Sequence, residues 1–284
     1  TIEFRNQTTT LGIMNPLRII LPTIFATSAL SCTGMTESKS SATGNRTGTE
    51  VLFEDSMTGN WQENWFLDGV ANSTVTNTED GLFYSGGTVT KPMDRKTYHA
   101  HHAVLWTKQV FEGDIRISYE MTRIDQSDYG NTLLYIHAQG TGDEPYAEDI
   151  SQWSDLREVP AMSKYFTNMG LLSLSFRHNI RARRYPLKSA DPREEAVGGT
   201  ARPYVDYIGM LPGKTYLVEA EVRGKDLTLR LSDKETGESY IDHAWDMTQL
   251  EDGKEAPVLN KGRIGLRHMS TKQFIYKDFK VEQL

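Results

Sequence analysis

Four arginines lie close together in the second half of the chain, and their spacing suits a site for an anion. They are Arg177, Arg181, Arg183 and Arg184. A guanidinium group can pair with a carboxylate through two parallel hydrogen bonds, and the formal net charge of the chain is -7. A basic cluster on an acidic protein therefore favours an anionic ligand. The alternative is a solvated arginine run that pairs with Asp191, Glu194 and Glu195.

Histidine and tyrosine side chains add groups that can carry a proton. An unperturbed histidine has a pKa of about 6.5, so it can act as an acid or as a base near neutral pH. The candidate catalytic residues are His102, His137, Arg177, His178 and Tyr185. The candidate ligand-binding residues are Tyr135, Arg181, Arg183, Tyr207 and Arg267. Two alternatives stay open, because His137 suits the role of a surface histidine or of a structural histidine with satisfied hydrogen bonds equally well, and loop tyrosines such as Tyr207 more often serve packing.

Three histidines, His99, His101 and His102, precede an apolar segment in the first half of the chain. Alternation along a strand places His102 on the same face as Val104 and Trp106, and His101 on the opposite face. Only one of the two can face a cleft, and we predict that it is His102. The spacing could also suit a metal ion, but no cysteine or carboxylate lies at ligand spacing. We therefore predict no cofactor, while a structural calcium ion stays open.

The elements that must position these residues are strands, because apolar and polar residues alternate through most of the chain after residue 50. Residues 133–139 place Leu134 and Ile136 on one face, and Tyr135 and His137 on the other. Further strands are predicted at 81–85, 103–109, 114–122, 171–178, 215–223, 226–232, 262–269 and 274–282. Arg177 points away from the apolar face of its strand. Many short strands with turn signals between them predict an all-β sandwich or jelly roll.

Two connections are long for a compact domain, and both follow strands that have candidate residues. They span residues 140–170 and 179–210. Loops of this length are uncommon unless they are functional or disordered. We expect a short helix around residues 150–158 in the first loop. The fold expected from the residues is thus a sandwich with two long loops.

The N-terminal segment has the order of a secretory signal followed by a lipid attachment site. A short segment from Met14 to Arg18 precedes an apolar run over 19–30 and then Ser31 and Cys32. The run is shorter than the ~20 residues that a membrane-spanning helix needs, so we predict that it is cleaved. Cys32 is the only cysteine of the sequence, and a lipid anchor explains a single cysteine in an oxidising compartment. The alternative is a buried free thiol.

These features divide the chain into three parts. We predict upstream residues and a signal peptide over 1–31, a lipidated flexible tether over 32–50 and a β-sandwich domain over 51–284. The tether consists largely of small and polar residues and cannot bury enough apolar surface to fold. We therefore expect an exported protein, anchored through lipid to the periplasmic or cell-surface side of a membrane. The acidic net charge argues against a nucleic-acid partner.

Three parts of the chain resemble concanavalin A-like lectin/glucanase domains. They are 51–56 (VLFEDS) with Trp61 and Trp65, 102–107 (HAVLWT) with 113–120 (GDIRISYE), and 262–268 (GRIGLRH) with 274–279 (FIYKDF). Within that superfamily the chain is similar to the YesU-like family of proteins from polysaccharide-utilisation loci. The resemblance covers roughly residues 51–284. It implies a concanavalin A-like β-sandwich with a jelly-roll topology.

The resemblance also implies an activity. By its size, its lipid attachment site at Cys32 and its overall pattern, the chain is similar to oligosaccharide dehydratases. These enzymes come from marine Bacteroidetes that degrade the polysaccharide ulvan. Such an enzyme removes water from a glucuronate or iduronate at the non-reducing end of an oligosaccharide and leaves a 4,5-unsaturated uronyl residue. The implied partner is an acidic oligosaccharide of the ulvan type. In this reaction an arginine would neutralise the carboxylate, while histidine and tyrosine would move protons.

Other functions stay open at this point. Retaining glucanases of the superfamily use the pattern Glu-x-Asp-x-x-Glu, which the sequence lacks; its nearest pairs are Glu219 with Glu221 and Glu148 with Asp149. Hydrolysis by two carboxylates is therefore disfavoured. A polysaccharide lyase would use the same elimination chemistry as a dehydratase. A non-catalytic surface lipoprotein would instead bind glycan through exposed aromatic side chains.

Overall fold

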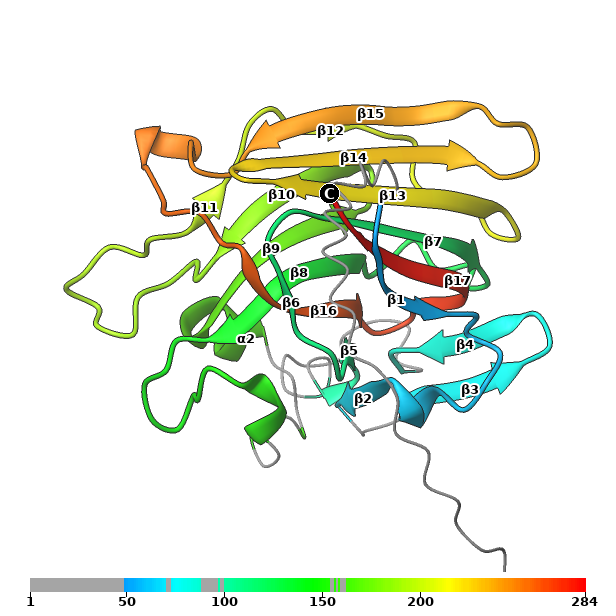
Figure 1. The fold of residues 1–284 in the computed structure, drawn as a ribbon, viewed down its shortest axis with the longest axis horizontal. Coiled ribbons are helices and arrows are strands. Elements are labelled where there is room, and N and C mark those ends of the chain that lie inside the picture. The colour runs from blue at the N-terminus through cyan, green and yellow to red at the C-terminus, as the bar shows by residue number, and fades with distance from the viewer. Residues whose placement is uncertain are drawn as a thin grey trace, which may run out of the picture. The chain divides into compact units, whose positions relative to one another are not determined.

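Two antiparallel sheets pack face to face in the computed structural model of the chain (Figure 1). The structure describes residues 49–69, 73–87, 97, 100–153, 156, 158 and 162–284. Cys32, the predicted signal peptide and most of the predicted tether lie outside these residues, as does His99. Lipid anchoring and export therefore stay predictions.

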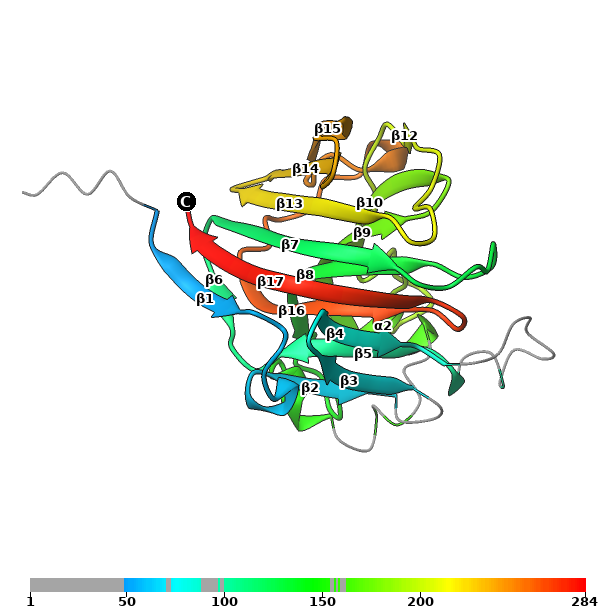
Figure 2. The same ribbon diagram turned by 90° about the vertical axis from the view of Figure 1, so that its right-hand side faces the viewer.

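The first sheet has eight strands within the described part of the chain. Along the sheet the order is β15 (Ser239–Asp246), β14 (Asp226–Asp233), β13 (Thr215–Arg223), β7 (Ile115–Arg123), β17 (Gln273–Gln283), β4 (Gly81–Ser85) and β3 (Thr74–Thr78), and β1 (Val51–Asp55) pairs with β17. Figure 2 shows β13, β7 and β17 running side by side in this layer.

The second sheet has nine strands in the same described ranges. The order is β11 (Gly199–Thr200), β10 (Asn179–Tyr185), β9 (Met169–Phe176), β8 (Thr132–Gly140), β16 (Lys261–His268), β5 (Ala103–Thr107) and β2 (Trp65–Asp68); β12 (Val205–Asp206) pairs with β10, and β6 (Phe111–Glu112) pairs with β16. Strands that are neighbours in one sheet come from distant parts of the chain, as β17, β7 and β13 do in the first sheet. Such crossing between sheets is typical of a jelly roll.

Short helices connect the strands. Those with bounds in the described part of the chain are the 3₁₀ helices η1 (Trp61–Glu63), η2 (Ile150–Gln152) and η4 (Glu251–Gly253), and the α-helix α2 (Met162–Asn168). Both η2 and α2 belong to the first long connection. Of the helix expected at 150–158, the structure describes the single turn of η2 and a 3₁₀ position at Leu156, and the α-helix of this connection begins later, at Met162.

Alternating apolar residues from both sheets form the core between them. Ile115 and Ile117 of β7 and Leu134 and Ile136 of β8 are completely buried in it. Removal of one such side chain from water contributes about 1.5–3 kcal/mol, so the alternation itself explains why these segments pair as they do. The predicted all-β sandwich is confirmed, and Gly81–Ser85 and Thr215–Arg223 have the predicted bounds.

The outer face of the nine-stranded sheet has a second, smaller apolar cluster. It includes Trp106 of β5, Leu171 of β9, Tyr165 of α2, and Ile150 and Trp153 of the η2 segment. The first long connection therefore folds back over the outer face of this sheet and buries part of it. Polar side chains beneath the connection are consequently removed from solvent.

The second long connection is shorter than predicted. Residues 179–185 form β10, which pairs with β9 after a tight turn at Arg177 and His178. The prediction of a loop that starts at Asn179 was wrong, because Ile180 and Ala182 alternate with arginines and fill the core from this strand. Because only two core-facing residues alternate with the arginines, the hydrophobic alternation of this strand is weaker than that of its neighbours.

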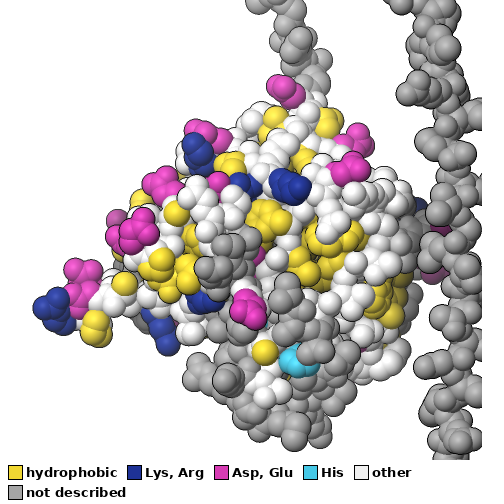
Figure 3. Space-filling model, turned by 90° about the horizontal axis from the view of Figure 1, so that it is seen from below, with side chains coloured by type: hydrophobic (Ala, Val, Ile, Leu, Met, Phe, Trp, Pro, Cys, Tyr) yellow, Lys and Arg dark blue, Asp and Glu magenta, His cyan; other side chains and the backbone are white. Residues whose placement is uncertain are grey.

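The end of the molecule that carries β2 and β3 shows acidic and basic side chains interspersed with apolar ones (Figure 3). No helix in the described part of the chain is long and apolar enough to cross a membrane.

Candidate functional site

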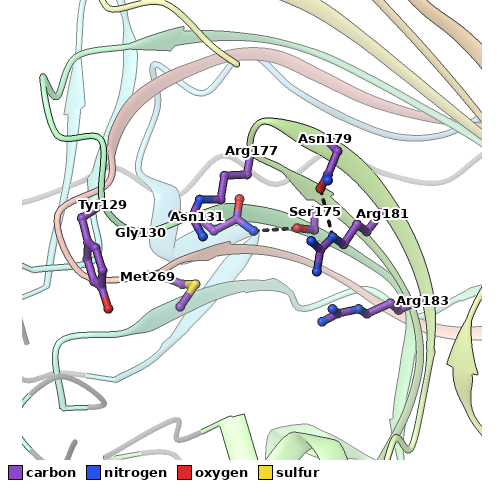
Figure 4. Close-up of a pocket in the computed structure, with 9 residues that line it drawn as sticks. All are labelled: Tyr129, Gly130, Asn131, Ser175, Arg177, Asn179, Arg181, Arg183 and Met269. Atoms are coloured by element: carbon purple, nitrogen blue, oxygen red, sulfur yellow. Dashed lines mark hydrogen bonds between the residues drawn. The ribbon is translucent and has the colours of Figure 1, made fainter. Parts of the chain in front are cut away.

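A hollow of about 270 Å³ lies on the outer face of the nine-stranded sheet, at the end where β9 turns into β10 (Figure 4). We call it the arginine pocket. Its lining residues come from β9, β10, the segment before β8 and the residue after β16, and they are Tyr129, Gly130, Asn131, Ser175, Arg177, Asn179, Arg181, Arg183 and Met269. It contains three of the four clustered arginines and no acidic side chain.

Strand alternation explains why three arginines share this pocket. Arg181 and Arg183 alternate along β10 with Ile180 and Ala182, which face the core. Arg177 follows β9 and continues its outward face. Figure 4 shows Arg181 and Arg183 side by side on β10, with Arg177 on the neighbouring strand end. The fourth clustered arginine, Arg184, falls on the inner face of β10 and is buried there.

The three pocket arginines have no carboxylate partner among the described residues. The nearby acids pair elsewhere, Asp191 with Arg193 and Glu195 with Lys254. Asp191 and Glu195 therefore do not neutralise the pocket arginines, as the alternative interpretation of the sequence required. Uncompensated cations in a hollow favour an anionic ligand, because the ligand supplies the missing countercharge.

Hydrogen bonds to uncharged side chains hold the pocket walls in place. The Arg181 Nε atom donates to Asn179 Oδ1 over 2.9 Å, and Asn131 Nδ2 donates to Ser175 Oγ over 2.6 Å. Among the described residues, Arg183 Nε and the neighbouring Ser173 Oγ are buried without a hydrogen-bond partner. A buried polar atom without a partner is costly, and a bound ligand or water removes the cost.

Four further candidate residues meet next to the arginine pocket. His102, Tyr135, Tyr185 and Arg267 are all fully buried on the outer face of the sheet, and we call them the buried polar cluster. One guanidinium nitrogen of Arg267, Nη1, donates to the Tyr135 hydroxyl over 2.8 Å. The other, Nη2, lies 3.1 Å from His102 Nδ1. His102 shares the outer face with Val104 and Trp106, as predicted, but it is fully buried, so its place in a cleft stays a prediction.

The hydrogen bond from Arg267 fixes the tautomer of the neighbouring His102. A guanidinium group has only donors, so His102 Nδ1 must accept, and the ring hydrogen then sits on Nε2. Burial acts against the charge of Arg267, but Tyr135, Tyr165 and Tyr185 raise its pKa above the ordinary value. The cluster therefore holds a permanent cation beside a neutral imidazole and two phenols.

Two further residues, Asp68 and Tyr165, adjoin the buried polar cluster, and neither was predicted from the sequence. Asp68 Oδ2, at the end of β2, accepts hydrogen bonds from Trp106 Nε1 over 2.8 Å and from the Tyr165 hydroxyl over 3.0 Å. The Tyr165 ring lies over the guanidinium of Arg267, 5.1 Å from its centroid. Alternation after Trp65 could have indicated Asp68, but no local pattern places Tyr165 on this face.

The pocket and the cluster are adjacent because their residues share rows across the sheet. Tyr135 pairs with Ser173, and Ser173 pairs with Arg183. Neighbouring strands lie about 4.8 Å apart, so the Arg183 backbone is about 10 Å from that of Tyr135. Burial raises the pKa of Tyr185, and the positive charge of Arg183 acts in the opposite direction. Arg183 is thus the pocket arginine at the boundary of the cluster.

His137 does not belong to this site, and its predicted placement beside Tyr135 was wrong. A β-bulge interrupts the alternation of β8, and His137 has a positive φ of 52°. Its ring is fully buried, with Nδ1 3.2 Å from the carbonyl of Leu259, and Leu259 packs against the core between the sheets. Burial lowers the pKa of His137. Ala138 takes the position on the outer face instead.

His178 and Tyr207 also lie away from the buried polar cluster. They line a separate hollow of about 470 Å³ together with Asp206, Glu238 and Tyr240. Tyr207 belongs to the core between the sheets, and burial raises its pKa. His178 follows Arg177 in the turn, is exposed there, and lines a further hollow of about 310 Å³ together with Arg177.

The two carboxylate pairs noted in the sequence are committed to other contacts. Glu221 pairs with Arg116 and Arg230 on the outer face of the eight-stranded sheet, and Glu219 pairs with Arg230 there. Asp149 caps η2 and pairs with Arg263 over 2.8 Å. Neither pair faces the arginine pocket. In the described ranges, no group of three or more His, Cys, Asp or Glu side chains is arranged to hold a metal ion.

The chain is similar in fold to several solved structures. A protein of unknown function with a galectin-like fold from Bacillus subtilis is 17% identical, with a TM-score of 0.56, over 82% of this chain and 96% of that chain. A carbohydrate-binding module from Bacillus subtilis is 12% identical, with a TM-score of 0.41, over 78% and 96%. A lectin complexed with galactose, UEA-II, is 14% identical, with a TM-score of 0.44, over 81% and 98%.

No protein-family model matches the chain, and no curated protein matches its sequence. At these identities the likeness concerns the fold alone. The chain has a galectin-like, concanavalin A-like β-sandwich, as the sequence resemblance implied.

Proposed function

We propose that this protein binds an acidic oligosaccharide by its non-reducing-end uronate and removes water from that sugar. One observation carries the proposal: an arginine pocket without acidic side chains adjoins a buried cluster of histidine, tyrosine and arginine. The first feature suits the carboxylate of the substrate, and the second suits proton transfer. The resemblance to the YesU-like family and to ulvan oligosaccharide dehydratases supports a glucuronate or iduronate as the sugar.

Neutralisation of the carboxylate is the first requirement of the reaction. Loss of the C5 proton places negative charge beside an existing anion, and a guanidinium group offsets that charge. We assign this contact to Arg183 rather than Arg177. Arg183 adjoins Tyr185 and has a buried Nε without a partner among the described residues, whereas Arg177 is exposed at the turn.

Proton transfer is the second requirement. A base removes the proton from C5, the C4–O bond breaks, an acid gives its proton to the departing hydroxyl, and the products are water and a C4=C5 double bond. His102, Tyr135 and Tyr185 are the proton carriers of the cluster. The reaction as proposed draws on side chains alone and consumes no oxidant or reductant.

Access to the cluster requires movement of α2. Tyr165 lies over Arg267, and the Phe166 ring is 5.1 Å from that of Tyr185. Both side chains belong to the first long connection, which rests on the outer face of the sheet. In our proposal these side chains give way when the terminal sugar enters, and they then exclude water from the reacting atoms.

The test is an assay of the purified protein with uronate-terminated oligosaccharides of the ulvan type. Loss of one water, with new ultraviolet absorbance from the unsaturated uronate, is the expected result. Cleavage of the chain with the same absorbance would instead identify a polysaccharide lyase. Binding without any change in mass would contradict the enzyme assignment and identify a glycan-binding protein. Lipid attachment at Cys32, as predicted from the sequence, would hold the protein at a membrane surface in either case.

A further inference from the structure

The Tyr165 side chain of α2 fills the space over the buried polar cluster. It is completely buried, and its ring centroid lies 5.1 Å from Cζ of Arg267. The same ring packs edge-on against Trp106 and Tyr135, with 6.4 Å between the ring centroids in each case. A sugar that is to reach Arg267 or Tyr135 from the side of α2 must therefore displace Tyr165.

The hydroxyl of Tyr165 binds a buried carboxylate. Asp68, at the end of β2, is almost completely buried, and its Oδ2 atom accepts from the Tyr165 hydroxyl over 3.0 Å and from Trp106 Nε1 over 2.8 Å. Burial raises the pKa of Tyr165, the charge of Asp68 raises it further, and the charge of Arg267 lowers it. A carboxylate away from water is costly unless donors surround it. Departure of Tyr165 therefore calls for another donor at Asp68.

The backbone of α2 is joined to its surroundings near its C-terminal end. Lys188 N donates to the Phe166 carbonyl over 2.8 Å, and Thr141 N donates to the Asn168 carbonyl over 3.1 Å. A helix of seven residues has little stability of its own and relies on its packing. Local opening of α2 therefore withdraws Tyr165 and leaves the sheet intact.

A sugar meets the same demands as the Tyr165 side chain. Like the phenol, a pyranose is a six-membered ring with a hydroxyl that donates to a carboxylate. Its C–H face packs on aromatic rings, and Trp106 and Tyr135 supply two of them. A hydrogen bond to an ionised acceptor is stronger than one between neutral groups. Asp68 therefore favours a ligand with a free hydroxyl.

The charges of the site determine which part of a uronate reaches Asp68. Asp68 repels the carboxylate of the sugar, whereas Arg183 attracts it. Phe166, next to Tyr165, lies edge-on to Tyr185, so withdrawal of α2 opens the cluster toward Tyr185 and the neighbouring Arg183. In the proposed reaction O4 leaves, and C1 is joined to the next sugar. The hydroxyl that remains for Asp68 is consequently the one at C2 or at C3.

We infer that Asp68 binds the C2 or C3 hydroxyl of the terminal uronate, and that the Tyr165 hydroxyl occupies this place in the empty protein. The inference rests on the proposed function, because it takes a uronate with its carboxylate at Arg183 as the ligand. Asp68 then determines specificity, since it binds a sugar with this hydroxyl and rejects one without it. Exchange of one hydroxyl for the other keeps the buried carboxylate hydrogen-bonded in both states.

Calorimetric titration of the full chain tests the contact with three disaccharides. One ends in glucuronate, and the other two end in the same sugar without the hydroxyl at C2 or at C3. The wild type should bind one of the deoxy ligands about tenfold to a hundredfold more weakly than the parent, because a hydrogen bond to a charged group is lost. Asp68→Asn should weaken the parent by a similar factor and should leave the affinity for that deoxy ligand nearly unchanged. Such coupling distinguishes a direct contact from a structural role.

A second pair of variants tests the place of Tyr165. Tyr165→Phe keeps the ring and removes the bond to Asp68. Amide hydrogen exchange in α2 should then be about tenfold faster, and the parent disaccharide should bind about threefold more tightly, because it no longer competes with the phenol. Tyr146→Phe alters a tyrosine of the same connection that packs on Trp153, and this control should change neither value. This pair decides the question if Asp68→Asn does not fold.

Three outcomes would overturn the inference. They are equal affinity of the wild type for all three disaccharides, equal losses of parent and deoxy ligands in Asp68→Asn, and a Tyr165→Phe variant that matches the wild type in exchange and affinity. Failure of the proposed function has a different signature. If the coupling is found but no ligand loses water, dehydration is rejected and the Asp68 contact is kept. If the wild type binds none of the disaccharides, both are rejected.

Discussion

The outward arginines of β10 and those of the eight-stranded sheet have opposite surroundings. On the eight-stranded sheet, Arg116 pairs with Glu221 over 2.7 Å, and Arg230 pairs with Glu219. On the nine-stranded sheet, Arg181 and Arg183 have no such partner among the described residues. The same side chain at the same kind of strand position thus serves the fold in one place and is open to a ligand in the other.

Strand register explains the difference. Glu219 is the cross-strand neighbour of Arg230, and Glu221 is that of Arg116. On β9 the neighbours of Arg181 and Arg183 are serines, Ser175 and Ser173, and on β11 the neighbour of Arg183 is Thr200. Opposite charges placed directly across strands stabilise a sheet by about 0.2–1 kcal/mol. The nine-stranded sheet forgoes this gain at two positions, which is the expected cost of a binding site.

The largest effect should follow from removal of the inner pocket arginine. Arg183→Ala should lower the turnover of a uronate-terminated oligosaccharide by about 10²–10³-fold, because loss of one preorganised donor to developing charge has that effect. Steady-state kinetics measure it. Arg116→Ala removes an arginine from the other sheet and should leave turnover within about twofold. Equal losses in the two variants would remove the functional distinction between the faces.

A carboxylate placed across from a pocket arginine should convert one face into the other. Ser175→Asp puts an acid opposite Arg181, as Glu219 is opposite Arg230. Because the new acid neutralises Arg181 and repels anions, affinity for an acidic oligosaccharide should fall at least tenfold. Calorimetric titration measures the affinity. Ser175→Ala is the control for the lost hydroxyl, and a similar loss in that variant would contradict the electrostatic explanation.

A buried histidine in the core between the sheets is kept uncharged by the fold, in contrast to the charged arginines on the outer faces. His268 is buried, 2.7 Å from the Tyr276 hydroxyl and stacked on Tyr84, and burial lowers its pKa to about 3. Between that value and the unfolded pKa of about 6.5, the unfolded chain binds one more proton than the folded one. Stability should therefore fall on acidification, by about 1 kcal/mol between pH 6 and pH 5.

Denaturant unfolding at several pH values measures this dependence. In His268→Phe the contribution of the histidine is lost, so the free energy of unfolding should vary less over the same interval. His178→Gln, which alters an exposed histidine, is the control. An unchanged pH dependence in His268→Phe would assign the acid sensitivity to other groups.

The smallest effect concerns the paired arginines themselves. The Arg230 side chain is 45% exposed, and exposed ion pairs contribute little because solvent screens them. Arg230→Ala should lower the free energy of unfolding by about 0.5 kcal/mol, measured by denaturant titration, and should not affect binding of an acidic ligand. A loss of binding in this variant would mean that both faces contact the ligand.

Alternation in the sequence was enough to orient most of the candidate site. It placed His102 with Val104 and Trp106, Tyr135 opposite Leu134 and Ile136, and Arg177 away from the core, as the structure does. These predictions succeed because a strand presents successive residues to opposite faces, a property of the backbone that requires no knowledge of neighbours.

Tertiary structure alone decided the rest. The bulge that buries His137 sets its ring against Leu259, which is far away in the sequence. Residues 179–185 pair locally with β9, but only the core between the sheets shows that Ile180 and Ala182 face inward. The same holds for Tyr165, which reaches Arg267 only because α2 folds over the sheet. The sequence shows four arginines; cross-strand register, set by the packing of whole strands, determines which of them lack a carboxylate neighbour.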